Sequence, residues 1–409
     1  IGNFNDENMI NILMYHHHVF PKKIRNTMNQ FESDLDRRNI DENLFSIDPE
    51  NCLDIDDALS ISYNEKETII GVHIAQPIFW LSQNDIIEKL KYQFSTLYIN
   101  EERKDLWGTE ITENSSLMEG KKKPAYSILF HFENNELIKV KDFPSFVTNK
   151  KKLSYDNAKN YTCAEELRDF TSRLTSIEDY HELVSYWMVK TNSYIGCKLA
   201  DKIPYRVNNK STLVNNIGGL PEDIGKKLLQ KNIESASYSY DNNYHFSLDL
   251  KNYCHFTSPI RRIMDTWIHY YLTYSKFENV EKINLDQVNY LDKETKKFHR
   301  TIELNNIITE VFEDNYSIER KGYITNIISN NTIEVFIEEF GFLKVRIYNL
   351  KFDYLIEKIK TETSLSLKYQ DKEYLYTLAD VIDLKLDKTE SVLPKDKLKI
   401  SILNSIILL

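Results

Sequence analysis

The sequence lacks an excess of basic residues, closely spaced cysteines and long apolar runs. Its formal net charge is -10 and its isoelectric point is about 5.6. A generally basic surface for nucleic acid is therefore excluded, and any phosphate-binding surface must be local, in a groove or tunnel. The cysteines form no Cys-x-x-Cys pair, which indicates buried free thiols in a reducing compartment. They are Cys52, Cys163, Cys197 and Cys254.

Two further absences concern membranes and export. No apolar run approaches the roughly 18 residues of a membrane span. The first residues do not resemble a signal peptide, so we expect an intracellular protein, cytoplasmic or nuclear. The chain begins without a methionine, which is compatible with a fragment of a longer protein. Its 409 residues, 41% of them apolar, are enough for one large domain and a smaller one.

Residues 46–61 contain the most informative acidic cluster of the sequence. Four aspartates fall between positions 48 and 57, and apolar residues flank them on both sides. This flanking predicts a half-buried segment. Carboxylates crowded into such a place repel one another unless a cation joins them. The stretch therefore predicts a divalent metal site made by Asp48, Asp54, Asp56 and Asp57.

The surrounding pattern predicts a mixed helical and strand domain. Alternating residues predict strands at 44–48, 57–63, 68–75 and 125–132, with the aspartates at a strand start or in the loop before it. Apolar residues at helical spacing predict helices at 85–92, across most of 163–200, and at 220–231. A short helix around 26–35 leads into this region. The three histidines at 16–18 are interpreted as a solvated loop or helix end.

The second informative stretch is residues 255–269, His-Phe-Thr-Ser-Pro-Ile-Arg-Arg-Ile-Met-Asp-Thr-Trp-Ile-His. Ser258 is a suitable N-cap and Pro259 a suitable first residue of a helix. Arg261 and Arg262 then fall in the first turn, where free amides and the helix dipole already favour an anion. We expect Asp265, four residues after Arg261, to orient that arginine. The stretch predicts a phosphate site, in preference to a surface helix with an ordinary ion pair.

The last part of the chain changes to short alternating segments. They predict strands at 321–328, 332–339, 343–349, 364–369, 373–381 and 397–407, after a helical connector at about 285–313. Short strands at this density predict a small closed β-barrel of the OB type, a fold that commonly binds single strands. The predicted domains are residues 1–315 and residues 316–409.

Together these stretches resemble the ribonuclease II / ribonuclease R superfamily, whose catalytic domain is the RNB domain. The resemblance is carried by Ser46-Ile-Asp-Pro, by Asp54-Ile-Asp-Asp-Ala-Leu-Ser and by His255-Phe-Thr-Ser-Pro-Ile-Arg-Arg. Shorter segments agree with it: Gly71-Val-His-Ile-Ala, Ser95-Thr-Leu-Tyr, Lys152-Leu-Ser-Tyr, Met188 with Asn192, and Tyr244-His-Phe-Ser-Leu as the strand before the arginine motif. It covers roughly residues 20–275. The implied fold class is α+β, with mixed sheets and flanking helices around an RNA channel.

The resemblance implies a 3′-to-5′ exoribonuclease that hydrolyses single-stranded RNA to nucleoside 5′-monophosphates. In the family pattern Asp48, Asp54 and Asp57 are ligands of Mg²⁺, for which Mn²⁺ can substitute. Asp56, also in the metal set, positions or deprotonates the attacking water. Arg261 matches the catalytic arginine. The implied RNA contacts are Thr257, Ser258 and Arg262 on phosphates, and Tyr98 and Tyr155 on bases.

This sequence departs from the family pattern in two places. The helix before Met188 usually carries a pair of glutamates, and here Ser185 and Tyr186 stand in those positions. The family also has RNA-binding domains before the RNB domain, for which this sequence has no room. We expect a longer chain, or a partner protein or complex, to supply them.

Two alternatives to an active exoribonuclease stay open. The absent leading domains and the acidic surface favour a catalytically weak or inactive RNA-binding or scaffold relative. A metal-dependent phosphohydrolase for small molecules fits the aspartates but leaves the second motif and the predicted barrel unexplained.

Overall fold

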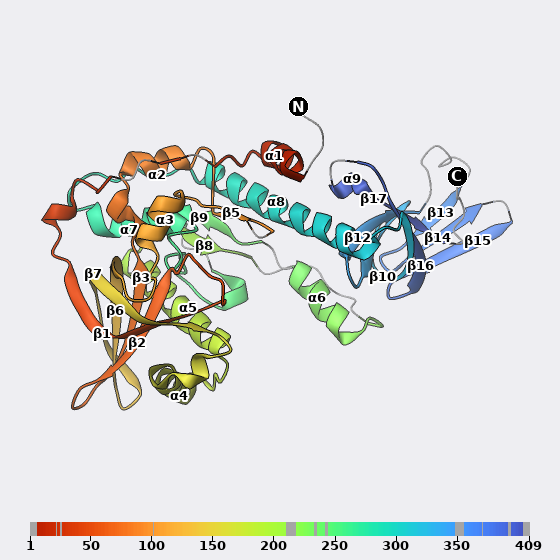
Figure 1. The fold of residues 1–409 in the computed structure, drawn as a ribbon. Coiled ribbons are helices and arrows are strands. Elements are labelled where there is room, and N and C mark those ends of the chain that lie inside the picture. The colour runs from red at the N-terminus through yellow and green to blue at the C-terminus, as the bar shows by residue number, and fades with distance from the viewer. Residues whose placement is uncertain are drawn as a thin grey trace. The chain divides into compact units, whose positions relative to one another are not determined.

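The computed structural model describes residues 6–21, 23–24, 27–100, 102–209, 218–232, 235–241, 244–347, 356–369, 371–391 and 394–403. The chain divides into two compact units (Figure 1). The barrel unit consists of residues 17–209 and 236–296, and the C-terminal unit of residues 1–16, 210–235 and 297–409. Across the described residues, no helix combines the length and the apolarity that a membrane crossing requires.

A closed five-stranded barrel forms the centre of the barrel unit. Its strands are β1 (Arg38–Asp48), β2 (Asp57–Tyr63), β3 (Thr68–Ala75), β6 (Lys122–Glu133) and β7 (Glu136–Ser154), in that order around the barrel. Neighbouring strands are antiparallel, except that β1 closes the barrel by parallel pairing with β7. The end of β1, the start of β2 and the end of β7 therefore lie at the same end of the barrel, where Asp48 pairs in register with Ser154.

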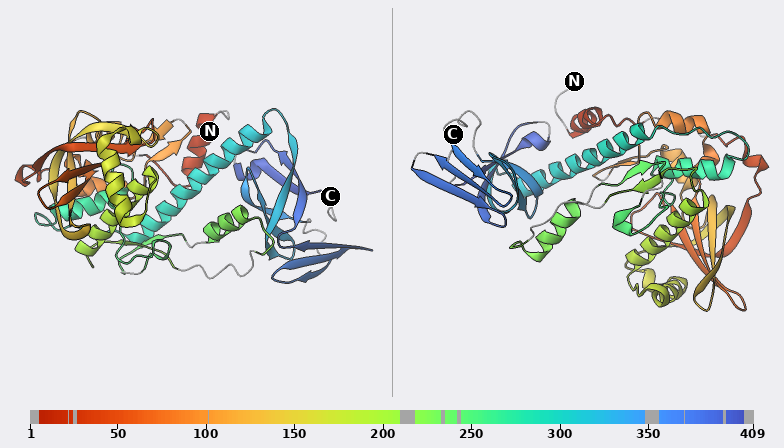
Figure 2. Two further views of the ribbon diagram at one scale, coloured as in Figure 1. Left: turned by 90° about the horizontal axis from the view of Figure 1, so that it is seen from below. Right: turned by 180° about the vertical axis from the view of Figure 1, so that it is seen from behind.

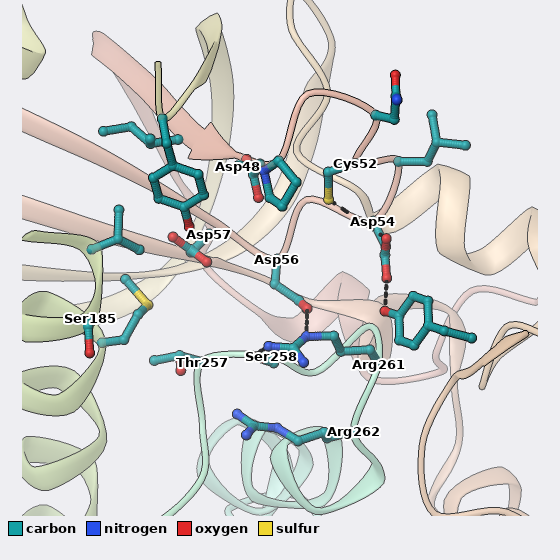
Figure 3. Close-up of a pocket in the computed structure, with 18 of the residues that line it drawn as sticks. Asp48, Cys52, Asp54, Asp56, Asp57, Ser185, Thr257, Ser258, Arg261 and Arg262 are labelled. Atoms are coloured by element: carbon teal, nitrogen blue, oxygen red, sulfur yellow. Dashed lines mark hydrogen bonds and ion pairs between the residues drawn. The ribbon is translucent and has the colours of Figure 1, made fainter. Parts of the chain in front are cut away.

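Helices and short hairpins complete this unit. The helices are α2 (Gln83–Lys89), α3 (Thr109–Ser115), α4 (Thr162–Thr175), α5 (Tyr180–Lys198) and α7 (Ile263–Tyr274). The hairpins pair β4 (Leu97–Ile99) with β5 (Glu102–Lys104), and β8 (Tyr205–Val207) with β9 (Ser237–Ser239). Helix α7 is buried along most of its length, and α5 contributes the fully buried Trp187 to the same core. This core places α5 and the segment before α7 near the aspartate end of the barrel (Figures 1 and 3).

Several sequence predictions in this unit need correction. The mainly helical pattern predicted at 163–200 is confirmed, and it consists of two helices, because Ser176 ends α4 in the left-handed conformation, with φ at 67°. Around 26–35 the described residues form only a 3-10 turn, Glu32–Asp34, and residues 25–26 lie outside the description. The family strand at 244–248 is instead a 3-10 turn, Phe246–Leu248. His17 is not solvated, since it is buried with its Nδ1 3.1 Å from Glu294 Oε2.

The C-terminal unit contains two antiparallel sheets. Strands β10 (Ser317–Ser329), β11 (Thr332–Ile337), β12 (Gly341–Arg346), β16 (Val381–Lys388) and β17 (Leu398–Ile402) form one sheet in the order β12-β11-β10-β16-β17. Strands β13 (Glu357–Lys360), β14 (Ser364–Tyr369) and β15 (Lys372–Thr377) form the other. Figure 2 shows both sheets in blue. Five strands in this order are compatible with a partly open OB barrel, which stays a prediction.

The remaining helices are α1 (Asp6–His16), α6 (Glu222–Asn232), α8 (Leu285–Phe312) and the single turn α9 (Pro394–Lys397). Residues of α8 after 297, such as Ile308 and Phe312, pack in the core of the C-terminal unit. The C-terminal compact unit therefore includes residues before position 315, and the domain boundary after that residue stays a prediction. Residues 348–349 and 404–407 of two predicted strands lie outside the described residues.

Candidate active site

A cavity of about 920 Å³ lies in the barrel unit, at the aspartate end of the barrel. All ten residues that the sequence singled out line it: Asp48, Asp54, Asp56, Asp57, Tyr98, Tyr155, Thr257, Ser258, Arg261 and Arg262. They come from four separate segments of the chain. The structure thus brings together both long motifs and both tyrosine segments, which lie up to about 200 residues apart in the sequence.

The four aspartates are held by a tightly fixed loop between β1 and β2. Asp48 ends β1 and Asp57 begins β2, while Asp54 and Asp56 lie in the connecting loop. Hydrogen bonds to neighbouring segments hold the loop. Ile55 N donates to Ser116 Oγ at 3.0 Å, and Ala75 N donates to Asp56 O at 2.8 Å. The Lys152 Nζ donates to Cys52 O at 2.7 Å and to Glu50 O at 3.2 Å.

Burial changes the acidity of three of these carboxyls. It raises the pKa of Asp48 to about 6 and that of Asp57 to about 8, and each of the two is also raised by a neighbouring aspartate. It raises the pKa of Asp56 well above its usual value, although the nearby Arg261 acts in the opposite direction. Burial likewise raises the pKa of the Cys52 thiol to about 12, which keeps it protonated. Burial therefore outweighs the positive charges nearby, which are Lys152 for Asp48 and Arg261 for Asp56 and Asp57.

Arg261 faces Asp56 across the cavity floor (Figure 3). Its Nε lies 3.5 Å from Asp56 Oδ2, and its Nη2 donates to Ser258 Oγ at 3.1 Å. Asp56 Oδ1 also accepts the backbone N–H of Ile260 at 2.7 Å. This amide and Arg261 join the aspartate loop to the segment before α7, so the two motifs form one site.

The predicted start of the arginine helix is wrong. Helix α7 begins at Ile263, and Arg262 before it is extended, with φ at -130° and ψ at 126°. The amides that would open an earlier helix are used elsewhere: Ile260 N donates to Asp56, and Ile263 N to Phe94 O at 3.1 Å. Arg261 therefore precedes the helix and gains no first-turn position.

The predicted partner of Asp265 is also wrong. Asp265 Oδ1 accepts from Arg262 Nη2 at 2.8 Å and from Ser258 N at 2.8 Å, while Arg261 faces Asp56. Asn192 of α5 fixes the preceding residues, since its Oδ1 accepts Phe256 N at 2.8 Å and its Nδ2 lies 3.4 Å from Thr257 Oγ1. Arg262 and Thr257, which line the cavity, thus already have hydrogen-bond partners within the chain.

The two tyrosines lie on different walls of the cavity. The Tyr98 hydroxyl donates to Asp54 Oδ2 at 2.6 Å, and Arg103 Nη1 donates to Asp54 Oδ1 at 3.0 Å. The ring of Tyr155, just after β7, stacks on His181 at the start of α5, with ring centroids 3.5 Å apart and planes 13° from parallel. Asp54 is therefore engaged by side chains of its own chain, and one face of Tyr155 is already covered.

The residues fit a hard divalent cation in their chemistry. Asp48 Oδ2 and Asp56 Oδ2 are buried and accept no hydrogen bond. Within the described ranges, no three His, Cys, Asp or Glu side chains are grouped closely enough to hold a metal on their own. Mg²⁺ is often bound through one or two carboxylates, with waters and substrate phosphates completing its shell, so this arrangement does not contradict such an ion.

The charge of the cavity lining also favours a bound cation. Six carboxyl and three guanidinium side chains line the cavity. A polyanion entering this place needs added positive charge. The acids are Asp48, Glu50, Asp54, Asp56, Asp57 and Glu102, and the arginines are Arg103, Arg261 and Arg262.

Sequence reasoning missed Arg103 and the contacts of Lys152. Arg103 lies five residues after Tyr98 in a segment with acids on both sides, a pattern that suggests an ordinary surface ion pair. The sequence shows Lys152 in the segment Lys-Leu-Ser-Tyr without indicating its partners. The signal that finds these contacts is spatial, because Asp54 lies 49 residues from Arg103, and the two carbonyls that Lys152 binds lie 100 or more residues away.

Comparisons with known proteins agree with the two motifs. The family model of the RNB domain matches residues 37–186 and 165–276, more than half of the chain. Ribonuclease R of Buchnera aphidicola is 31% identical over 199 residues, which cover 43% of this chain and 26% of that protein. Ribonuclease R of Chlamydia trachomatis is 22% identical over 325 residues, 60% of this chain and 46% of that protein. The chain spans half or less of the length of these relatives.

Solved structures share the fold at low sequence identity. Mycoplasma genitalium RNase R in complex with ribose methylated single-stranded RNA matches with a TM-score of 0.75 and 18% identity, over 96% of this chain and 77% of that one. Yeast Ssd1, described as a pseudonuclease, matches with a TM-score of 0.70 and 13% identity, over 98% and 74%. These likenesses concern the fold, and the match to the family model carries the assignment: this chain belongs to the RNB-domain family.

Proposed function

We propose that this protein is a Mg²⁺-dependent 3′-to-5′ exoribonuclease that hydrolyses single-stranded RNA to nucleoside 5′-monophosphates. The observation that carries the proposal is the joined site, in which buried carboxyls from the β1–β2 loop meet Arg261 from the segment before α7. Membership of the RNB family and the Ribonuclease R relatives support the same reaction class.

Asp48 and Asp57 are the residues best placed to hold the cation. Both are half-buried, Asp48 raises the pKa of Asp57, and they lie together at the ends of adjacent strands (Figure 3). Asp56 contributes an oxygen that accepts no hydrogen bond. A bound Mg²⁺ supplies an acidified water and neutralises charge on a phosphodiester. Mn²⁺, which also prefers oxygen ligands, is expected to substitute for it.

Arg261 provides the positive charge that the developing phosphorane needs. Its side chain is about half exposed, at 46%, and the described chain gives it only Ser258 and Asp56 as partners. Several of its five N–H donors are therefore available for an anion. Fixed donors beside the reacting phosphate stabilise the transition state more than the ground state. Asp56, whose Oδ2 lies 3.5 Å from Arg261 Nε, is proposed to orient or deprotonate the attacking water.

Tyr98 and Tyr155 are proposed to stack on bases near the 3′ end. Stacking on aromatic rings tolerates every base, so we expect low sequence specificity. Thr257, Ser258 and Arg262 line the same cavity and are proposed to contact neighbouring phosphates.

The domain division at residue 315 and an OB-type end that contributes to RNA binding also belong to this proposal, as does an intracellular location.

A second candidate is an RNA-binding relative without activity. The likeness to Ssd1 favours it, as does the engagement of Asp54 by Tyr98 and Arg103. Single-stranded RNA labelled at its 5′ end, incubated with and without Mg²⁺, separates the two candidates. A ladder that shortens from the 3′ end supports the exoribonuclease. Binding without cleavage in either Mg²⁺ or Mn²⁺ would favour the second candidate.

The substitution Asp57→Asn tests the metal assignment within the first candidate. It removes a half-buried carboxylate while leaving the tyrosines and arginines in place, so cleavage should fall by at least about 100-fold while RNA affinity is retained. Cleavage is measured by the same gel, and RNA binding by fluorescence anisotropy in EDTA. Glu65→Gln, an exposed acid in the β2–β3 turn, is the matched control. Loss of RNA binding together with cleavage would contradict this role of Asp57.

A further inference from the structure

Arg103 is a cavity residue to which no role has been given. It lies on β5, with its side chain 19% exposed, and it contacts two buried acids. Its Nη1 donates to Asp54 Oδ1 at 3.0 Å, and its Nε lies 2.9 Å from Asp105 Oδ1. The planar guanidinium holds fixed directions for such contacts, which a lysine would not. Arg103 therefore fixes Asp54 in orientation as well as in charge.

Tyr98 approaches the same carboxylate from the neighbouring strand. Tyr98 and Arg103 are direct partners in the antiparallel β4–β5 pair, so their side chains lie on the same face of the hairpin. The Tyr98 hydroxyl donates to Asp54 Oδ2 at 2.6 Å. Asp54 thus accepts hydrogen bonds on both oxygens, since Cys52 Sγ also donates to Oδ1 at 3.8 Å. The hairpin is fastened to the aspartate loop at two points, by Tyr98 and by Arg103.

This arrangement competes with a cation at Asp54. A carboxylate oxygen offers two lone pairs. Oδ1 uses both, for Arg103 and for Cys52, so a metal there would displace one of these donors, and Arg103 could lose one of its two acids in a largely buried place. A metal on Oδ2 would share that atom with the Tyr98 hydroxyl. Asp48 and Asp56 each keep an oxygen that accepts no hydrogen bond. In Figure 3, Asp48 and Asp57 lie to one side of Asp56 and Asp54 lies to the other. The cation and the hairpin therefore have separate carboxylates.

The contact also fixes a partly exposed aromatic ring. Tyr98 is 43% exposed and lines the cavity, although its hydroxyl is held. An aromatic side chain that is fixed before its ligand arrives loses less conformational freedom on binding. Such a ring is suited to receive a base.

We propose that Arg103 and Asp54 form a clamp that positions the Tyr98 ring for an RNA base, and that Asp54 is a positioning residue and not a metal ligand. The assignment rests on the proposed function, because it takes RNA as the ligand. It adds Arg103 to the site and separates Asp54 from the other three aspartates.

Two binding measurements test the clamp. The affinity for a short 5′-fluorescent single-stranded oligoadenylate is measured by anisotropy in EDTA, and Mn²⁺ binding is measured by electron paramagnetic resonance without RNA. Arg103→Gln and Asp54→Asn should each weaken RNA binding by about 5- to 30-fold, the range of one base–aromatic stack, and leave Mn²⁺ affinity within about 2-fold. Asp57→Asn should do the opposite. The double variant should lose no more RNA affinity than either single variant.

The matched control for Arg103→Gln is Lys104→Gln. Lys104 is the next residue of β5, its side chain is 42% exposed, and its substitution removes the same charge. RNA affinity of the control should stay within about 2-fold of the unchanged protein. If Arg103→Gln does not fold, Tyr98→Phe tests the same contact, because it removes the hydroxyl and keeps the ring. It should also weaken RNA binding and leave Mn²⁺ binding unchanged.

Three outcomes would overturn the assignment. If Arg103→Gln, or Tyr98→Phe in its place, binds RNA as tightly as Lys104→Gln, the clamp does not position the ring. If Asp54→Asn loses Mn²⁺ affinity as Asp57→Asn does, Asp54 is a metal ligand. If the unchanged protein does not bind the oligonucleotide at all, the proposed function fails and the clamp loses its ligand. Since only the last outcome involves the unchanged protein, the two failures are distinguishable.

Discussion

Asp48 and Asp57 make the stability of the cation-free protein depend on pH. Burial raises their pKa values from an ordinary 3.8 to about 6 and about 8. The folded state therefore holds these protons more tightly than the unfolded chain does. The stability they contribute is present below about pH 4 and is lost as pH rises through 6 and 8.

We therefore expect the melting temperature in EDTA to fall between pH 5 and pH 8. Asp57→Asn should flatten this fall, because the substituted side chain does not ionise and no longer contributes its raised pKa. Added Mg²⁺ should stabilise the unchanged protein more at pH 8 than at pH 5, since metal binding competes with protons. Thermal melts at several pH values measure both effects. Parallel pH curves for the two proteins would contradict the stated pKa values.

Residue types could be predicted better than residue partners. All ten predicted site residues line one cavity, because residue type and spacing carry the chemistry that a phosphate site needs. Arg261 was assigned to Asp265, four residues away, whereas it faces Asp56, about 200 residues away. The contacts of Asp54 with Tyr98 and Arg103 have no periodic signal at all. Only the folded barrel brings these groups together.

At the level of elements, helix α5 depends on one glycine for its packing. A Cβ built on Gly196 would lie 1.7 Å from the carbonyl oxygen of Asn252, in the loop before the arginine motif. Replacement of glycine by alanine in a helix usually stabilises the helix. Here the added methyl group would push the backbone of Asn252 away from α5. We expect Gly196→Ala to lower the free energy of unfolding by about 1–3 kcal/mol or more.

Urea denaturation measures this change. The exposed neighbour Cys197, replaced by alanine, serves as the control and should stay within about 0.5 kcal/mol. Equal stability of Gly196→Ala and the control would show that the loop can move away from α5 without cost.

The start of α5 also places a ring beside the cavity. Asp179 caps the helix by accepting from His181 N at 2.7 Å and Glu182 N at 3.1 Å, and His181 stacks on Tyr155. Because one face of Tyr155 is covered, a base has only the other face. We expect Tyr155→Ala to change the length of the final RNA product, and His181→Ala to change it in the same direction but less. High-resolution gels of complete digests measure this length. An unchanged end product would remove Tyr155 from the RNA path.

Elements could be predicted where local pattern suffices. The strands at 57–63 and 68–75 agree with β2 and β3, since alternation marks a strand with one buried face. The closure of the barrel could not be predicted, because β1 pairs in parallel with β7, about 100 residues away. The start of α7 was misplaced because the amide of Ile260 has a partner in Asp56 that no local rule shows.

At the scale of the whole molecule, the acidic net charge limits how RNA can be bound. With a formal charge of -10, we expect affinity to depend on few phosphate contacts. The slope of log affinity against log salt should then be shallow, at roughly -0.7 for each neutralised phosphate of a single strand. Arg261→Gln should reduce the slope by about 0.7. Anisotropy titrations at several salt concentrations measure it, and an unchanged slope would contradict a phosphate contact of Arg261.

The grouping of segments into compact units could not be predicted from the sequence, and the domain boundary after residue 315 stays a prediction. The sequence changes character near residue 319, but helix α6 and the α8 residues from 297 group with the C-terminal sheets. Composition shows where strands replace helices. It does not show which earlier segments return to pack on them, because that depends on contacts distant in sequence.

The most direct test of the central claim follows the last phosphodiester of an RNA. A single-stranded RNA is prepared with radioactive phosphate only in its 3′-terminal linkage and is incubated with the protein in Mg²⁺. Our account predicts that the first turnover releases the label as a nucleoside 5′-monophosphate, and that EDTA or Asp57→Asn prevents this release. Label released as a 3′-monophosphate or as inorganic phosphate, or retained in the RNA in both Mg²⁺ and Mn²⁺, would contradict the account.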